Sequence, residues 1–203
     1  MPQITDVVPA IRKAAIACLL LIGLMIAGSA PLFAQKAETI EASAMGTGTQ
    51  LGQVVEVRLI INDYSTMEDR QVLVQAFEKG QNQGLVNALS KMRAVGRISL
   101  TGTIGYDVSF IRMIPTPTGR KIRFVTNRQI RFGEAWTDSQ SQAFNLSGGE
   151  IDINDSDKSK STGVLFPQAQ LVIDKQGQLQ IDLAQNSWKL VDVLDWKGTP
   201  GVN

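Results

Sequence analysis

Apolar and polar residues alternate along most of the chain after residue 95, and this period of two is typical of half-buried β-strands. An earlier stretch, Val55–Ile61, shows the same alternation and predicts the first strand. The later predicted strands are Arg97–Thr103, Tyr106–Ile114, Arg120–Phe132, Gln142–Leu146, Glu150–Ile153, Val164–Ile173 and Leu179–Leu183. The segment Trp188–Trp196 fits either a last strand or a short helix.

Between the first strand and residue 95, the apolar spacing changes to the period of a helix. One helix is predicted to follow a capping box at Ser65–Glu68 and to stop at Gly80, and a second to run from about Asn82 to Arg93. Their apolar faces consist of Leu73, Ala76 and Phe77 in the first helix and of Leu85, Ala88, Leu89 and Met92 in the second. The sequence therefore predicts an α+β fold. We expect a curved antiparallel β-meander, partly or fully closed into a barrel-like sheet, with an αα-hairpin inserted after the first strand.

The first 34 residues have the three-part layout of an export signal. Arg12 and Lys13 precede the apolar run Ala14–Ala27, and small residues then lead to Ala34, after which we expect cleavage. The run is shorter than the roughly 20 residues that a membrane-spanning helix needs. The sequence therefore predicts a periplasmic or secreted protein with no transmembrane span after cleavage. An uncleaved N-terminal anchor is the alternative.

The remainder of the chain is expected to form one domain. Residues 35–52 are small, polar and glycine-rich, which predicts a flexible lead-in. Residues 53–196 contain the predicted strands and helices of a single α+β domain, and residues 197–203 form a C-terminal tail. A chain of this length can build a hydrophobic core without disulfides.

Missing residue types exclude several kinds of chemistry. The chain has no histidine, and Cys18 in the signal is its single cysteine. This excludes the Ser-His-Asp and Cys-His nucleophile systems, thiol redox chemistry and the common zinc sites in the mature chain. Without the signal, basic and acidic residues balance at 18 each, because Arg12, Lys13 and Asp6 leave with it. A neutral exported chain is not expected to bind nucleic acid.

A run of acids and amides between residues 152 and 157 could in principle surround a calcium ion. However, Asp157 and Gly163 occupy the positions where an EF-hand loop has its glycine and its bidentate glutamate. A solvated loop is the better interpretation. We therefore predict no metal site and no cofactor.

Several stretches of the chain resemble a family of uncharacterised exported bacterial proteins. The resemblance extends from Tyr64 to Ile130, about half of the mature chain. It is based on Tyr64-Ser65-Thr66, Asp69-Arg70, Ala76-Phe77, Gly84-Leu85, Ala88-Leu89, Lys91-Met92, Gly96-Arg97-Ile98, Gly102-Thr103-Ile104-Gly105-Tyr106 and Ile111-Arg112. It implies a shared fold and export, and it carries no catalytic motif and no assigned activity.

Charged residues are ordered in two blocks along the chain. The basic block is Arg112, Arg120, Lys121, Arg123, Arg128 and Arg131, and the acidic block is Glu134, Asp138, Glu150, Asp152, Asp155 and Asp157. If the blocks occupy neighbouring antiparallel strands, opposite charges face each other across the ladder. The alternative is an exposed basic patch that binds an anionic component of the envelope.

The expected hairpin register draws attention to two arginines. A turn at Pro115–Gly119 places Arg112 opposite Ile122 and Tyr106 opposite Arg128. Both arginines then lie on an apolar face, where an unpaired charge is costly to bury. Either a bulge rotates them outward, or they reach into a cavity and bind an anion there. In the second case Tyr106 can stack on Arg128.

Two functional hypotheses follow from these observations. The first is a non-catalytic exported binding or accessory protein that holds an anionic or lipid-like small ligand, or an envelope protein, with Arg112, Arg128 and Tyr106 in the site. The second is a carboxylate-dependent, glycosidase-like hydrolase of envelope glycans. Its two acids would come from Asp107, Glu134, Glu150 and Asp152, because glycoside cleavage needs two suitably spaced carboxyl groups.

Overall fold

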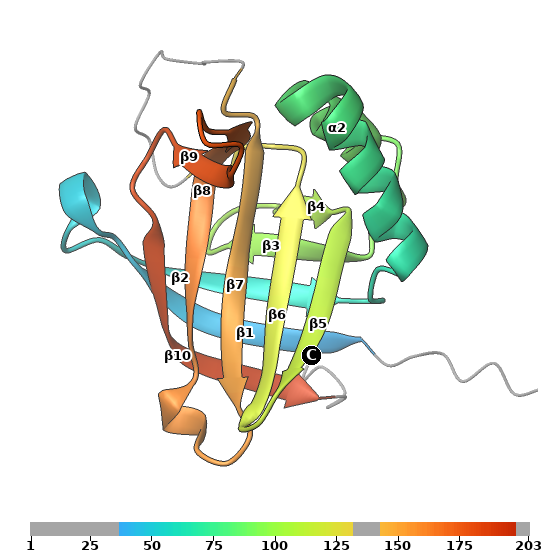
Figure 1. Cartoon of the computed structure of the whole chain (residues 1–203). Helices are drawn as coiled ribbons and strands as arrows, with labels where there is room; N and C mark the ends of the chain where they lie inside the picture. Colours follow the sequence, from blue (N-terminus) through green and yellow to red (C-terminus); the bar gives the residue numbers. More distant parts are fainter. Residues whose placement is uncertain (1–36, 132–142, 198–203) are drawn as a thin grey trace, which may run out of the picture. The chain divides into compact units, whose positions relative to one another are not determined.

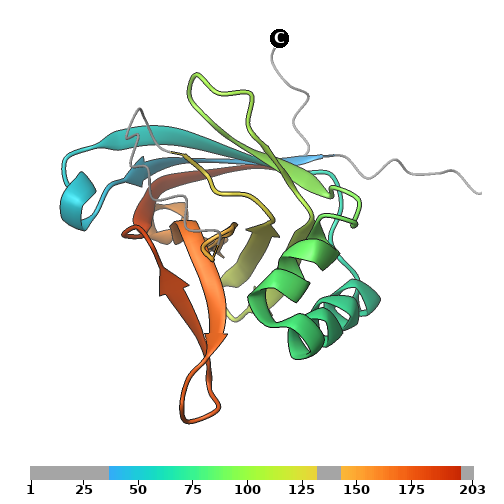
Figure 2. The ribbon, with the colours of Figure 1, turned by 90° about the horizontal axis from the view of Figure 1, so that it is seen from above.

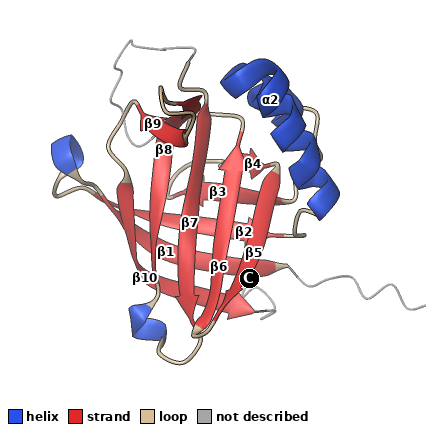
Figure 3. Cartoon of the chain, in the orientation of Figure 1, coloured by secondary structure: helices blue, strands red, loops and turns tan. Residues whose placement is uncertain are grey.

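The computed structural model describes residues 37–131 and 143–197, and these form one antiparallel β-rich unit. The strands are β1 (Glu38–Met45), β2 (Val54–Ile61), β3 (Gly96–Leu100), β4 (Tyr106–Val108), β5 (Phe110–Thr116), β6 (Gly119–Thr126), β7 (Leu146–Asn154), β8 (Thr162–Ile173), β9 (Leu179–Leu183) and β10 (Trp188–Lys197). The helix α2 (Met67–Leu89) lies between β2 and β3, and two short 3-10 turns, η2 (Gly48–Gln50) and η3 (Lys158–Lys160), lie in loops. Figure 3 shows how far strands outnumber helices.

The strands form a nearly closed, barrel-like sheet (Figure 1). Their order is β4-β3-β2-β1-β10-β8-β7-β6-β5, and β9 pairs with β8 outside this path. The two end strands, β4 and β5, follow each other directly in the chain. The predicted barrel-like antiparallel sheet is therefore confirmed, and its order places the N-terminal strand beside the C-terminal one.

The prediction of a flexible lead-in at residues 35–52 is wrong for most of that segment. Glu38–Met45 forms β1, which pairs with β2 on one side and β10 on the other. Its buried residues are Ile40, Ala42 and Ala44. Alanine adds little to a hydrophobic alternation, so this strand is not visible in the apolar pattern. The domain accordingly begins at β1 instead of at Gln53.

The predicted αα-hairpin after the first strand is also wrong. One helix, α2, follows the second strand, and it is bent at Gln81, whose φ of 50° and ψ of −145° are not helical. Its capping box uses Thr66 and Asp69, one residue later than expected. Within the described residues, no helix is both long and apolar enough to cross a membrane.

Two hydrophobic clusters hold this unit together. The larger one fills the interior of the sheet, and its fully buried residues include Trp188, Phe124 and Ile122. The smaller one packs the apolar face of α2, with Leu85 and Leu89 buried, against the outer face of β5–β8. The predicted apolar helix faces therefore do cover the sheet, but they belong to one bent helix.

Most predicted strands are present with shifted ends. Tyr106–Ile114 divides into β4 and β5, and the expected strand Arg120–Phe132 ends at Thr126. The ambiguous segment Trp188–Trp196 is the strand β10. The predicted signal peptide and all but Lys197 of the predicted tail lie outside the described residues.

Candidate functional site

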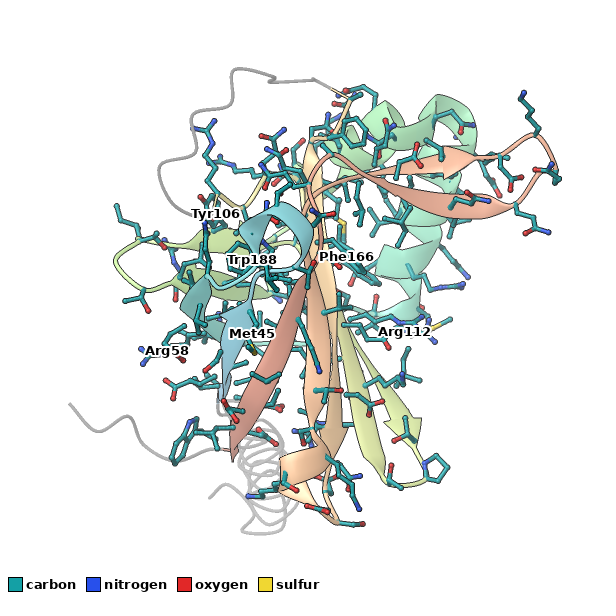
Figure 4. The ribbon with its side chains drawn as sticks, turned by 90° about the vertical axis from the view of Figure 1, so that its left-hand side faces the viewer. Met45, Arg58, Tyr106, Arg112, Phe166 and Trp188 are labelled. Atoms are coloured by element: carbon teal, nitrogen blue, oxygen red, sulfur yellow. The ribbon has the colours of Figure 1, made fainter. Side chains whose placement is uncertain are left out.

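The register of the β5–β6 hairpin decides where the predicted site residues lie. Its tight turn pairs Thr116 with Gly119, which places Arg112 opposite Arg123 instead of Ile122. A shift of one residue moves every side chain to the other face of the sheet. Arg112 therefore lies on the outer face, away from the hydrophobic interior. Figure 4 shows Arg112 and Tyr106 on different sides of the unit, so the predicted pairing of Arg112 with Arg128 and Tyr106 in one site is wrong.

Part of each charge block lies on β6 or β7, and there opposite charges face each other, which is the first of the two alternatives that the sequence left open. Lys121 Nζ lies 2.8 Å from Glu150 and 3.2 Å from Asp152, and Arg123 Nε lies 2.6 Å from Glu150. Hydrogen bonds from Lys121 and Arg123 lower the pKa of Glu150. Glu150 is therefore held ionised on the outer face of the sheet.

One arginine does enter the interior of the sheet, and it is Arg120. Its Nη2 donates to Glu38 and, at 2.6 Å, to Asp195, so it connects β6 with the start of β1 and the end of β10. Tyr64 Oη donates to the second oxygen of Glu38 at 2.8 Å. Burial alone would lower the pKa of Arg120, but the two carboxylates outweigh it and raise that pKa. We call these four residues the buried charge cluster.

A cavity of about 310 Å³ lies between the C-terminal end of α2, the β3–β4 hairpin and the segment that follows β6. A second hollow of about 420 Å³ adjoins it. Both are lined by Tyr106, Asn127 and Arg128, and we call the combined space the Tyr106–Arg128 groove. Two of the three predicted ligand-binding residues are thus brought together, from positions 22 residues apart.

A buried serine fixes the backbone next to the groove. Ser147 Oγ lies within hydrogen-bonding distance of the main-chain oxygens of Arg128 and Pro167, and it accepts from Ile130 N at 2.8 Å. Ile130 itself is fully buried in the interior cluster. The backbone at Arg128 is therefore anchored, while the side chain of Arg128 stays exposed.

The opposite wall is stiffened by Arg97, which the sequence did not single out. Arg97 donates from Nε to the oxygen of Ile104 at 2.9 Å and pairs with Asp107 at 3.1 Å across β3 and β4. Tyr106 Oη accepts a long hydrogen bond of 3.4 Å from Arg131 N. Tyr106 thus spans the groove from β4 to the segment after β6. The alternating pattern of Arg97–Thr103 could have placed Arg97 on the outer face, but not beside Arg128.

The charge of the groove is positive in the part of the chain that the structure describes. Its lining includes the cations Arg97, Arg128 and Arg131, and the acid Asp107. Asp107 neutralises Arg97, and no described carboxylate forms an ion pair with Arg128 or Arg131. The remaining polar lining residues are Ser90, Ser109, Asn127, Gln129 and Asn145. Two arginines surrounded by hydroxyl and amide groups suit a ligand with several acceptor oxygens.

The four candidate acids of the hydrolase hypothesis do not meet in this groove. Asp107 lines it, whereas Glu150 and Asp152 lie on the outer face with Lys121, and Glu134 lies outside the described residues. A catalytic acid needs a raised pKa, and that of Glu150 is lowered. Among the described residues, no group of three acids could hold a metal ion. In the loop considered for calcium, Asp157 caps η3 by accepting from Ser159.

No protein-family model matches this chain, and neither a curated protein nor a solved structure shows significant similarity to it. The resemblance to a family of exported proteins therefore stays a prediction.

Proposed function

We propose that this protein is a non-catalytic binding protein of the bacterial envelope that holds an anionic ligand in the Tyr106–Arg128 groove. The observation that carries the proposal is the positive charge of a cavity whose walls are anchored. Arg128 and Arg131 have no ion-pair partner among the described residues, and the main chain beside Arg128 is held by the buried Ser147. The export signal supports a periplasmic or secreted location.

The ligand chemistry follows from the lining. Guanidinium groups bind phosphate and carboxylate with paired hydrogen bonds, and Tyr106 lines the same space as Arg128. A phosphorylated lipid head group and an acidic glycan both carry such oxyanions. The hydrolase hypothesis has weaker support, because its described acids are separated and two of them are ion-paired with Lys121.

The test uses one substitution at two positions. Arg128→Met removes the arginine that lines both parts of the groove, and Arg112→Met makes the same change on the outer face of β5. Melting temperatures are measured with inorganic phosphate and with chloride at equal ionic strength. A ligand that binds only the folded state at 100 times its Kd stabilises it by about 2.7 kcal/mol. For a domain of this size this corresponds to a rise of about 5–10 °C.

We expect phosphate to raise the melting temperature of the parent protein and of Arg112→Met, but not of Arg128→Met. Vesicles of phosphatidylglycerol, compared with phosphatidylcholine, then separate a lipid source from a soluble one. Equal phosphate effects in all three proteins would show that the groove is not the binding site.

A further inference from the structure

The β8–β9 hairpin extends beyond the barrel-like sheet (Figure 2). Within it, β9 pairs with β8 and lies outside the main strand order. All five residues of β9 are exposed, and β8 is the one described strand that pairs with it. Leu179, Ile181 and Leu183 share one face, and all three are exposed. Natural edge strands are usually protected by lysine, proline or a bulge. This strand, Leu-Gln-Ile-Asp-Leu, has none of these.

The hydrogen bonds of the hairpin show which backbone groups are free. Asp174 N donates to Gln178 O, and Ala184 N donates to Gln168 O, so both pairs belong to the hydrogen-bonded set of the ladder. Such pairs alternate along an antiparallel ladder. Gln180 and Asp182 therefore direct their backbone groups toward β8. The N–H and C=O groups of Leu179, Ile181 and Leu183 point away from β8, toward the free edge.

The sequence of β9 is nearly symmetric about Ile181. It has leucine at both ends, and a glutamine and an aspartate at equivalent positions on either side of the centre. An antiparallel pair of two such strands, with a two-fold axis at Ile181, places Leu179 opposite Leu183 and Ile181 opposite itself. These are the residues whose backbone groups are free. The pairing therefore gives a hydrogen-bond partner to all six free N–H and C=O groups of each strand.

Charge complementarity selects this register over its neighbours. With the axis at Ile181, the Asp182 carboxylate faces the carboxamide of Gln180 from the other strand. With the axis at Asp182, two carboxylates would face each other at the closer of the two pair spacings, which is unfavourable. With the axis at Gln180, Leu183 would lose its partner. The central register is therefore the one that pairs every free group without opposing like charges.

We propose that β9 is the interface of a symmetric homodimer, in which the β8–β9 hairpins of two copies join edge to edge into a four-stranded sheet. Their apolar faces, which include Ile173 and Leu171, then become continuous across the axis. An interface of this size is small, so a dissociation constant of about micromolar or weaker is expected. The dimer does not depend on the ligand proposed for the Tyr106–Arg128 groove.

Cysteine cross-linking tests the register in the full chain with Cys18→Ser as background. In Ile181→Cys the cysteines of the two copies lie directly opposite each other as a hydrogen-bonded pair. Their Cα atoms are then about 5.5 Å apart, within the range of a disulfide. In the matched control Asp182→Cys, the two equivalent residues lie diagonally, about 7–8 Å apart. We expect mild oxidation to link Ile181→Cys into dimers at least tenfold faster. Equal rates, or no dimer in either variant, would overturn the proposal.

Proline provides a second, independent measurement. Ile181→Pro removes an outward N–H while leaving the groups that face β8, so the hairpin itself should stay folded. Sedimentation velocity from about 1 to about 100 µM should show dimer in the parent and monomer in Ile181→Pro, with unchanged melting temperature at low concentration. A dimeric Ile181→Pro, or a parent that stays monomeric throughout, would contradict the edge-to-edge pairing.

Discussion

Replacing Arg120 with methionine should destabilise this fold far more than the same change at the exposed Arg123 of the same strand. The side chains of the buried charge cluster are largely withdrawn from water, with Arg120 11%, Glu38 15% and Asp195 9% exposed. Methionine keeps much of the side-chain volume but removes the guanidinium group that both Glu38 and Asp195 contact. Removing one partner of a buried ion pair costs about 3–5 kcal/mol.

Thermal unfolding followed by circular dichroism measures this effect. For a domain of this size each kcal/mol corresponds to about 2–4 °C, so Arg120→Met should melt about 6–20 °C below the parent at neutral pH. This difference in melting temperature between Arg120→Met and the parent should become smaller as the pH is lowered. Protonated carboxyl groups are less costly to bury, so the folded variant takes up protons more readily than the unfolded chain and gains stability as the pH falls.

Two further variants test the reasoning. Arg123→Met makes the same change three residues along β6, on a side chain that is 57% exposed and paired with Glu150, and it should cost at most about 1 kcal/mol. Combining Arg120→Met with Glu38→Gln and Asp195→Asn removes both buried carboxylate charges and should recover much of the lost stability. The reasoning is refuted if Arg120→Met melts within a degree or two of Arg123→Met.

The remaining predictions concern α2 and the buried tyrosine. Leu89→Ala removes a fully buried side chain between α2 and the sheet and should cost about 2–5 kcal/mol in chemical denaturation, whereas an unchanged midpoint would contradict the packing of α2. Gln81→Gly relieves a positive φ at the bend and should stabilise the fold by about 1 kcal/mol; a loss of stability would show that the bend is unstrained. Burial and the hydrogen bond to Glu38 raise the pKa of Tyr64, so its stabilising effect is complete below about pH 10 and is lost as the pH rises further. Tyr64→Phe should therefore melt lower at neutral pH but lose less stability than the parent above pH about 10, and parallel pH profiles would disprove this.

Local patterns in the sequence were sufficient for the elements whose residues repeat at a regular period. Val54–Ile61 and Leu179–Leu183 were predicted almost to the residue, because each presents a clear apolar alternation. The facing of Lys121 and Arg123 with Glu150 and Asp152 also followed from the sequence, because β6 and β7 are neighbours both in the chain and in the sheet. The strand Glu38–Met45 was missed because two of its three buried residues are alanines.

For the candidate site, the sequence predicted Arg112, Arg128 and Tyr106 together, whereas the structure brings Tyr106 and Arg128 to one groove and leaves Arg112 on the outer face. The side-chain period of a strand is two, so an error of one residue in the hairpin register exchanged the inner and outer faces of β5. Arg120, and not Arg112, enters the interior. An inward arginine was expected to bind an anion in a cavity, whereas Arg120 is paired with two carboxylates of the chain itself.

The period of each segment, the order of charge along it and the chemistry that its residue types exclude can be read from the amino-acid sequence. Which distant segments meet is set only in the folded chain. Closure of the sheet brings Glu38 and Asp195 to Arg120 across 82 and 75 residues, and the fold brings Arg97 and Arg128 to the lining of one cavity. Alternation along a strand shows which of its residues share a face, because successive side chains point to opposite sides. Strand order and register depend instead on hydrogen bonds and packing between segments that share no local pattern.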